Sequence, residues 1–129
     1  MRLLFDTHIW VWSMVEPRRL APRIHRELLD PGNELWLSPI SVWEVLLLHA
    51  KGRIQFATDV REWTEHAIAN FREAPLTHEI AMAAHNLPLA GRDPADRFLA
   101  ATAEVLGLTL VTADEKLLGL GNIATLANR

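Results

Sequence analysis

Cysteine is absent from this chain of 129 residues. Its absence excludes a disulfide scaffold, a thiolate-ligated zinc site and a thiol nucleophile. Also missing is any apolar run near the ~20 residues that span a bilayer. The first ten residues hold one arginine, a short apolar run and an aspartate, with no small-residue cleavage site, so they do not resemble a signal peptide. We therefore expect a soluble protein of the cytoplasm with no membrane partner.

An excess of basic charge is lacking too. Sixteen acidic side chains stand against thirteen basic ones, for a formal net charge of -3. Proteins that hold nucleic acid by bulk electrostatics alone are usually basic. If this chain handles nucleic acid or phosphate, positive charge must be supplied locally, and a metal ion held by carboxylates would do so.

Apolar side chains, by contrast, are plentiful at 50% of the composition. A chain of this length buries roughly two-thirds of its unfolded surface, and this composition is sufficient for such a core. The sequence shows no repeat, no low-complexity tract and no linker. We expect one domain over residues 1–129.

Short apolar runs alternate with segments of helical spacing. Strands are predicted at 2–5, 34–37, 74–76, 108–111 and 123–126. Helices are predicted at 8–15, 22–29, 39–51, 59–71, 77–86, 93–106 and 114–118, with connections at 18–21 and 87–92. This alternation predicts an α/β fold in which a mostly parallel sheet of four to five strands is flanked by helices on both faces. Functional sites in such folds lie beyond the carboxyl ends of the strands.

Two of the predicted strands run into carboxylates. Asp6 follows the strand at 2–5, and Asp114 comes shortly after the strand at 108–111. In a parallel sheet both side chains would lie at the same edge. Each aspartate also fits a helix N-cap, which is worth about 1 kcal/mol. The residues alone leave both interpretations open.

Glu44 is the most informative acid in the sequence. Between residues 40 and 48 only Ser41 and Glu44 are polar. A helix that is apolar nearly all round is largely buried, and a glutamate in its middle is costly unless it is paired, protonated or bound to a cation. An ion pair with an arginine is the structural alternative, but the burial argument favours a functional role.

Asp93 and Asp96 open the helix predicted at 93–106. Asp93 precedes Pro94 and fits an N-cap, while Asp96 in the first turn is favoured by the helix dipole. Residue physics alone ranks both as structural, although Asp96 is also placed to project into the same cleft as the strand-end acids. A cluster of such carboxylates would repel itself without a cation, and all-oxygen ligands suit Mg²⁺ or Mn²⁺.

Four segments together resemble a known family. They are LFDTHIW at 4–10, SPISVWE at 38–44, RDPADRFLAATA at 92–103 and LVTAD at 110–114. In this order and spacing they resemble PIN-domain ribonucleases, most closely the VapC-like toxins of bacterial type II toxin–antitoxin systems. Segments 51–54 and 74–77 fit the same subgroup, so the resemblance runs almost end to end.

The resemblance implies a PIN-like three-layer sandwich and an endoribonuclease that depends on Mg²⁺ or Mn²⁺. The family's acidic site maps onto Asp6, Glu44, Asp96 and Asp114. Thr7 and Thr112 match hydroxyl positions near the metal, and Arg97 matches an Asp-Arg pair in which the arginine contacts phosphate or supports the site. Lys116 stands where many relatives carry a further acid, which leaves the number of bound metals open.

The family's activity and partners follow from the same resemblance. It implies that a metal-activated water attacks an RNA phosphodiester and leaves a 3′-hydroxyl and a 5′-phosphate. It also implies a homodimer and a cognate antitoxin protein, with which the chain would form a higher hetero-oligomer.

Three other functions are compatible with parts of this sequence. The first is a DNA nuclease or another phosphodiesterase with the same metal site, and the second is a PIN-fold binding module without chemistry. The third is a phosphoacceptor signalling domain, which would need adjacent acids after its first strand and a lysine after a later one. Thr7 follows Asp6 here, and the last strand carries no lysine.

Overall fold

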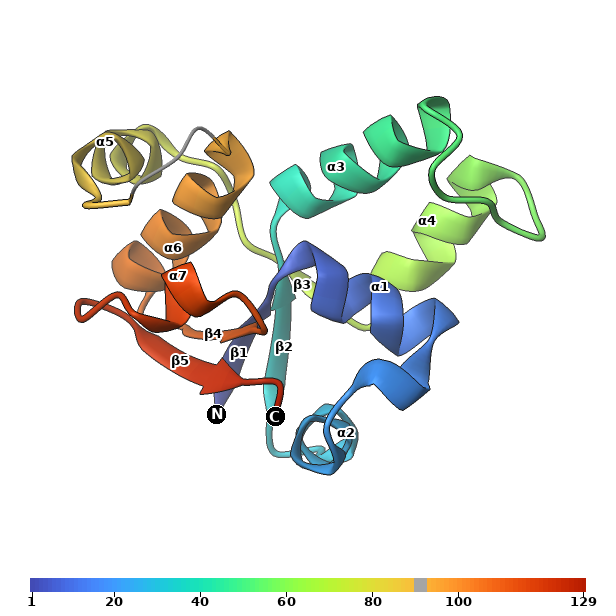
Figure 1. The fold of residues 1–129 in the computed structure, drawn as a ribbon, viewed down its shortest axis with the longest axis horizontal. Helices are drawn as coiled ribbons and strands as arrows, with labels where there is room; N and C mark the ends of the chain where they lie inside the picture. Colours follow the sequence, from blue (N-terminus) through green and yellow to red (C-terminus); the bar gives the residue numbers. More distant parts are fainter. Residues whose placement is uncertain (90–92) are drawn as a thin grey trace.

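A computed structural model describes residues 1–89 and 93–129, and its centre is a parallel sheet of five strands in the order β3-β2-β1-β4-β5 (Figure 1). The strands are β1 Arg2–Phe5, β2 Glu34–Leu37, β3 Arg72–Glu73, β4 Thr109–Thr112 and β5 Ala124–Ala127. All four neighbouring pairs run parallel. The predicted α/β class, sheet type and strand number are confirmed.

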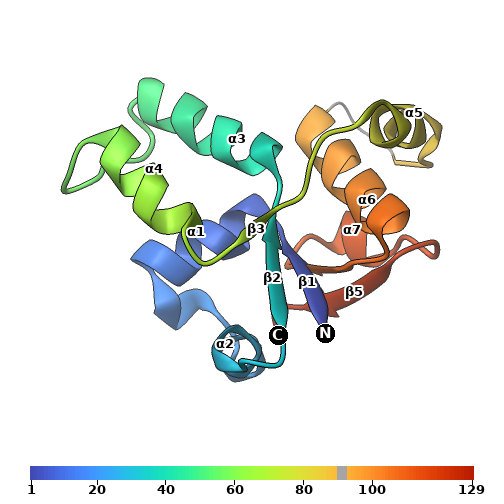
Figure 2. The same cartoon turned by 180° about the vertical axis from the view of Figure 1, so that it is seen from behind.

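Helices cover both faces of this sheet. They are α1 Thr7–Val15, the 3-10 helix η1 Pro17–Arg19, α2 Pro22–Leu29, α3 Pro39–Ala50, α4 Val60–Ile68, α5 His78–Asn86, α6 Pro94–Leu106 and α7 Glu115–Leu118. Figures 1 and 2 show α1, α2 and α4 on one side of the sheet and α5, α6 and α7 on the other. The three layers are as expected. Residues 90–92, part of the predicted connection at 87–92, lie outside the described residues.

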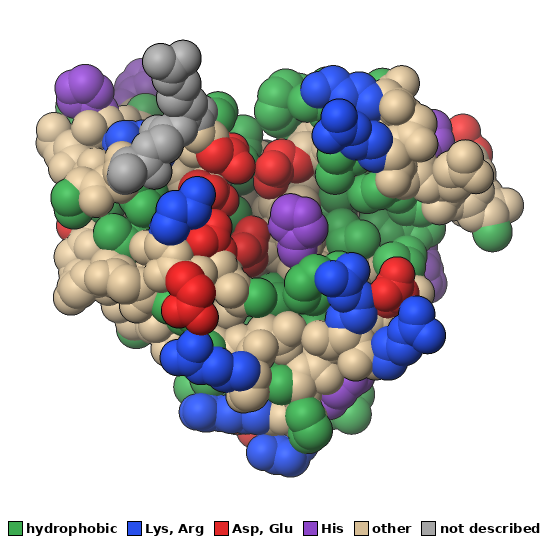
Figure 3. All heavy atoms as spheres, viewed as in Figure 1, with side chains coloured by type: hydrophobic (Ala, Val, Ile, Leu, Met, Phe, Trp, Pro, Cys, Tyr) green, Lys and Arg blue, Asp and Glu red, His purple; other side chains and the backbone are tan. Residues whose placement is uncertain are grey.

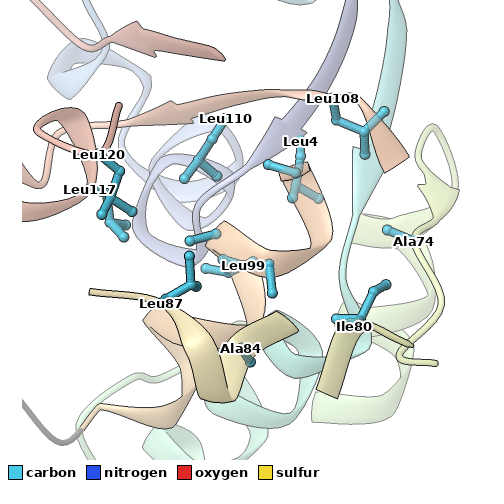
Figure 4. Close-up of a cluster of buried hydrophobic side chains, with 13 residues drawn as sticks. Leu4, Ala74, Ile80, Ala84, Leu87, Leu99, Leu108, Leu110, Leu117 and Leu120 are labelled. Carbon is cyan, nitrogen blue, oxygen red and sulfur yellow. The ribbon is translucent and has the colours of Figure 1, made fainter. Parts of the chain in front are cut away.

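The two helical layers enclose two separate cores because successive side chains of a strand point to opposite faces. On β1, Leu3 and Phe5 pack with α1, α2 and α4, whereas Leu4 packs with α5 and α6. Figure 4 shows Leu4 and Leu110 gathered with Leu99 of α6 in the second core. The continuous apolar pattern of β1 and β4 is therefore explained by burial on both faces.

The third strand differs from the prediction. We expected it at 74–76, but β3 is Arg72–Glu73, paired with Trp36 and Leu37 of β2. The ladder ends at Ala74, whose N–H donates to the Leu37 carbonyl at 2.9 Å, because the next residue, Pro75, has no N–H to donate. Both strand residues are exposed and charged, so the hydrophobic pattern did not reveal this edge strand.

The helix predicted at 59–71 is also shorter than expected. Asp59 caps α4 by accepting from the N–H groups of Arg61 and Glu62, and the helix ends at Ile68. Phe71 lies beyond the helix, where its ring packs edge-on against Phe5 with 5.5 Å between ring centroids. Phe71 fits the apolar spacing of the helix because it packs in the same core, although it is not part of the helix.

Burial of α3 is the third departure. The all-round apolar pattern predicted a buried helix, but only Ser41 and Val45 are buried, and Trp43 is 53% exposed. The helix packs against α1, α4 and α6 beyond the carboxyl end of the sheet and leaves Trp43 and Leu46 exposed on its outer side. Within the residues described, no helix is both long and apolar enough to cross a membrane.

The core predicts a clear stability difference between two apolar residues. Leu99 is fully buried between α6 and the sheet, so Leu99→Ala is expected to lower the free energy of unfolding by about 2–5 kcal/mol. Met82 of α5 is 64% exposed, and Met82→Ala is expected to change it by less than about 0.5 kcal/mol. Urea unfolding of both variants measures the difference, and equal effects would contradict the packing described here.

Candidate active site

Asp6 lies at the carboxyl end of β1, immediately before α1. Its side chain makes no capping hydrogen bond to α1. Instead the hydroxyl of Thr112, at the end of β4, donates to Asp6 Oδ2 at 2.7 Å. The backbone N–H of Asp6 also donates to the Val111 carbonyl at 3.0 Å. The Asp6 side chain is therefore held across the sheet by Thr112 and makes no capping hydrogen bond to α1, which decides against the capping interpretation.

Asp114 occupies the matching place after β4. It does cap a helix, because its Oδ1 accepts from the N–H of Lys116 at 2.9 Å. Its own N–H donates to the Thr112 hydroxyl at 3.0 Å, so Thr112 connects the two strand-end acids. Both strand ends thus meet at one edge of the sheet, as the sequence predicted.

Glu44 reaches the same edge from α3 and is held by a hydroxyl pair. Thr7 Oγ1 lies 2.5 Å from Glu44 Oε1 and 2.8 Å from Ser41 Oγ. Since a hydroxyl has one proton, Thr7 donates to the carboxylate and accepts from Ser41. No ion pair of Glu44 occurs among the described residues, so the arginine alternative finds no support there.

Asp96 comes from the first turn of α6. Its neighbour Asp93 is the N-cap of that helix and accepts from the N–H of Ala95 at 3.0 Å. The four predicted acids line one pocket, whose remaining walls come from His8, Trp12, Arg19, Asp93 and Ala113. Figure 3 shows acidic side chains gathered in a hollow, with a histidine and basic side chains around it.

Burial and mutual repulsion shift the pKa values of three of these acids upward. For Asp6 and Glu44 burial is the main cause, and the hydrogen bonds from Thr112 and Thr7 oppose it. Burial raises the pKa of Asp96 to about 7, and the negative charges of neighbouring acids, Asp93 first, add to the rise. A site that raises the pKa of several acids together favours the binding of positive charge.

The donor set fits a divalent cation in kind. Carboxylate and hydroxyl oxygens are the ligands that Mg²⁺ and Mn²⁺ prefer. As the side chains stand, no three acidic or histidine residues in the described part of the chain are close enough to surround one ion. Mg²⁺ commonly keeps several waters and uses one or two carboxylates directly, which suits an open acidic pocket of this kind.

Arg97 faces away from the acids. Its Nη1 donates to the carbonyls of Ala84 and Leu87 at 3.1 and 3.2 Å, and its Nη2 donates to the Leu89 carbonyl at 2.7 Å. The guanidinium thus ties α6 to the end of α5 and the segment that follows it. This geometry favours the supporting role of Arg97 over a phosphate contact.

Two parts of the site were not recognised from the sequence. Ser41 is fully buried and positions Thr7, and its signal was its place one turn before Glu44 as the other polar residue of an apolar helix. Trp12 and Arg19 form a further wall of the pocket. The signal for Trp12 was its spacing of four from His8, which places these two residues on one face of α1. Arg19 lies on η1, and no spacing marked it.

The fold and the site together define a class of protein. It is a three-layer α/β protein with a parallel sheet, whose carboxyl edge gathers acidic side chains with oxygen donors suited to a hard divalent cation.

Comparison with known proteins then identifies the family. A family model described as PIN domain matches residues 3–122, so this chain belongs to the PIN-domain family. The chain is 34% identical over 116 residues to Ribonuclease VapC22 of Mycobacterium tuberculosis, a match that covers 89% of this chain and 88% of that relative. Within the family it therefore groups with the VapC-like proteins.

Solved structures show the same fold. DNA-bound VapBC from Salmonella typhimurium matches with a TM-score of 0.76 and 17% identity over 100% of this chain and 99% of that one. VapBC2 from Rickettsia felis, bound to a DNA fragment from its promoter, matches with a TM-score of 0.73 and 17% identity over 98% of each chain. The PIN-like sandwich implied by the resemblance is thereby confirmed.

The raised pKa of Asp96 predicts how stability depends on pH in a chelating buffer. The folded protein holds this proton up to a pKa of about 7, whereas the unfolded chain releases it near 3.8. Wild-type stability therefore falls as the pH rises between these values. Asp96→Asn removes this penalty, so the variant should be more stable than wild type at pH 8, with a gain that shrinks toward pH 4.

Urea unfolding at pH 4 and pH 8 measures this gain. Glu62→Gln on α4 is the matched control, because Glu62 is exposed and outside the pocket, and this variant should not show the gain at pH 8. A gain for Asp96→Asn of equal size at both pH values contradicts the electrostatic description of the site.

Proposed function

We propose that this protein is a divalent-metal-dependent endoribonuclease that acts as the toxin of a type II toxin–antitoxin pair in the cytoplasm. The observation that carries the proposal is the convergence of Asp6, Glu44, Asp96 and Asp114 on one pocket at the carboxyl edge of the sheet. The PIN-family match and the relative named Ribonuclease VapC22 support the nuclease activity. The chain acts as one nuclease domain over residues 1–129.

The four acids are the proposed holders of Mg²⁺ or Mn²⁺. When bound, such an ion would polarise a phosphoryl oxygen of the substrate and activate a water. Thr112 orients Asp6 and Thr7 with Ser41 orients Glu44, because each carboxylate accepts a hydrogen bond from a hydroxyl that the fold holds in place. Arg97 supports the arrangement by fixing the helix that carries Asp96.

A protein partner is proposed as well. The structural neighbours include a toxin–antitoxin complex from Klebsiella pneumoniae, which matches with a TM-score of 0.70 and 21% identity over 98% of each chain. On this chain a groove between α3, the end of α4 and β3 is lined mainly by apolar side chains, including Trp43, Leu46 and Ile68. Exposed apolar patches of this kind mark protein contacts. We infer a homodimer through this groove and a higher hetero-oligomer with an antitoxin.

The nuclease proposal predicts a loss of cleavage that depends on one carboxylate. Wild type should cleave total RNA in Mg²⁺ or Mn²⁺ and stop when EDTA is added. Asp96→Asn keeps the shape of the side chain but removes a charge, so cleavage should fall by at least about a hundredfold. Asp59→Asn is the matched control, because Asn also caps helices and Asp59 caps α4 outside the pocket.

The same assay separates the alternatives. Equal cleavage by wild type and Asp96→Asn contradicts the assignment of the site. Preferred cleavage of single-stranded or duplex DNA would replace the ribonuclease proposal by the DNA nuclease. Mg²⁺ binding in calorimetry without cleavage of either polymer would leave a binding module.

The groove predicts the oligomeric state. Wild type is expected to be a dimer by light scattering after gel filtration, and Trp43→Asp should be a monomer because it buries a charge in the contact. Met82→Asp adds the same charge to another exposed apolar residue, on α5 outside the groove, and should stay a dimer. A wild-type monomer, or a dimeric Trp43→Asp variant, refutes this contact.

A further inference from the structure

One wall of the acidic pocket carries no carboxylate. It consists of His8 and Trp12 on α1 and Arg19 on η1, all of which line the pocket with the four acids. The rings of His8 and Trp12 lie 6.0 Å apart between centroids. The guanidinium carbon of Arg19 lies 4.1 Å from the centroid of the Trp12 ring, so the two side chains form a cation–π interaction.

Arg19 stands out among the charges of this pocket. The pocket is lined by five carboxylates, and within the described residues Arg19 is the one lysine or arginine that lines it. Its side chain remains 52% exposed. Arg97, by comparison, uses both terminal nitrogens on backbone carbonyls. Arg19 therefore keeps N–H donors for a ligand.

A purely structural role explains Arg19 less well. Its Nε lies 3.9 Å from Glu16 Oε2, a carboxylate oxygen that Arg18 also approaches to 3.9 Å. The turn is already held by two backbone hydrogen bonds of 3.0 Å and by the buried side chain of Leu20. An exposed ion pair at this distance contributes little. The turn does not need this side chain to keep its shape.

The acids alone do not select a direction for an RNA strand. A strand with its cleaved phosphate at the carboxylates must leave the pocket past some wall, and the other acids repel its neighbouring phosphates. A planar guanidinium binds phosphate oxygens through two parallel N–H groups. Stacking on an aromatic ring fixes the orientation of the guanidinium before the phosphate binds, and this lowers the conformational entropy lost on binding.

We propose that Arg19, held on Trp12, is a positioning residue that binds the backbone phosphate next to the cleaved one in single-stranded RNA. This inference rests on the proposed nuclease function and adds a second phosphate contact to it. Trp12 acts through Arg19 rather than on the RNA itself. The wall formed by α1 and η1 is thus the side on which the strand leaves the acidic pocket.

The test measures binding of the full chain to a fluorescent, mixed-sequence single-stranded RNA by anisotropy over a series of salt concentrations. An Asp96→Asn background prevents cleavage. Arg19→Gln is expected to weaken binding about tenfold and to reduce the slope of log K against log[salt] by about 0.7, the value for one lost phosphate contact on a single strand. Arg61→Gln is the control, since Arg61 is also exposed and paired with one glutamate, Glu65 at 3.0 Å, outside the pocket.

Further variants distinguish positioning from folding. Trp12→Ala should weaken binding in the presence of Arg19 but add nothing in the Arg19→Gln background, and Trp12→Phe should restore most of the affinity. Arg19→Lys should keep the salt slope and lose part of the affinity, which gives a second reading if Arg19→Gln proves unstable. With Asp96 restored, Arg19→Gln should raise KM more than it lowers kcat.

Two failures can be told apart. If wild type cleaves RNA but Arg19→Gln matches Arg61→Gln in affinity and salt slope, the inference is wrong and the nuclease proposal stands. If wild type neither binds nor cleaves RNA, both are wrong. Thermal unfolding of each variant provides the fold control, and a change in melting temperature without a change in salt slope also overturns the positioning role.

Discussion

The candidate active site depends on a hydrogen bond between two residues that are 106 positions apart in the chain, from the Thr112 hydroxyl to Asp6. It forms because β1 and β4 are parallel neighbours in which Phe5 is paired with Val111, so both strands end at the same height. The bond orients one carboxylate and opposes the rise in pKa that burial causes. Because α1 and α7 start directly beyond these strand ends, their positions follow from the same pairing.

The site opposes folding stability, and the fold compensates locally. Burial, and then repulsion among the carboxylates gathered in the pocket, raise the pKa of Asp96 to about 7. Thr7, which contacts Ser41, donates to Glu44 as Thr112 donates to Asp6, so two of the four acids each have a hydroxyl donor. Conflicts between local stability and the global fold of this kind concentrate at functional sites. The net charge of -3 therefore says little about nucleic acid binding, because part of it is concentrated in one pocket.

The hydrophobic pattern of the sequence predicted an element correctly wherever the element's own side chains are buried. Leu3 to Phe5 and Leu110 to Val111 are buried on both faces of the sheet, and their unbroken apolar runs predicted strands correctly. The hydrophobic pattern failed where an element forms through backbone hydrogen bonds to a neighbouring strand and not through burial of its own side chains. Arg72 and Glu73 form β3 because β2 offers free backbone groups at the sheet edge, and no hydrophobic period marks them. Trp43 showed the converse error, because an apolar residue on a helix does not have to face the core of its own chain.

The sequence by itself determined the class of fold, the order of its elements and the cost of a glutamate in the apolar helix around Glu44. Spacing along the chain was enough for this, since helix and strand periods and caps are local. The set of four acids came from the family resemblance, because the residues alone also fitted Asp6, Asp96 and Asp114 as structural acids at helix starts. Tertiary structure alone decided which of these acids cap a helix with their side chains. Asp6 and Asp93 each directly precede a helix, yet Asp93 caps its helix while Asp6 turns to Thr112. It also decided that Arg97 braces α6 and that Arg19 lies on Trp12 at the pocket wall. The physical reason is that the partners of a side chain across the sheet are set by strand register and helix packing, which no spacing within one segment encodes.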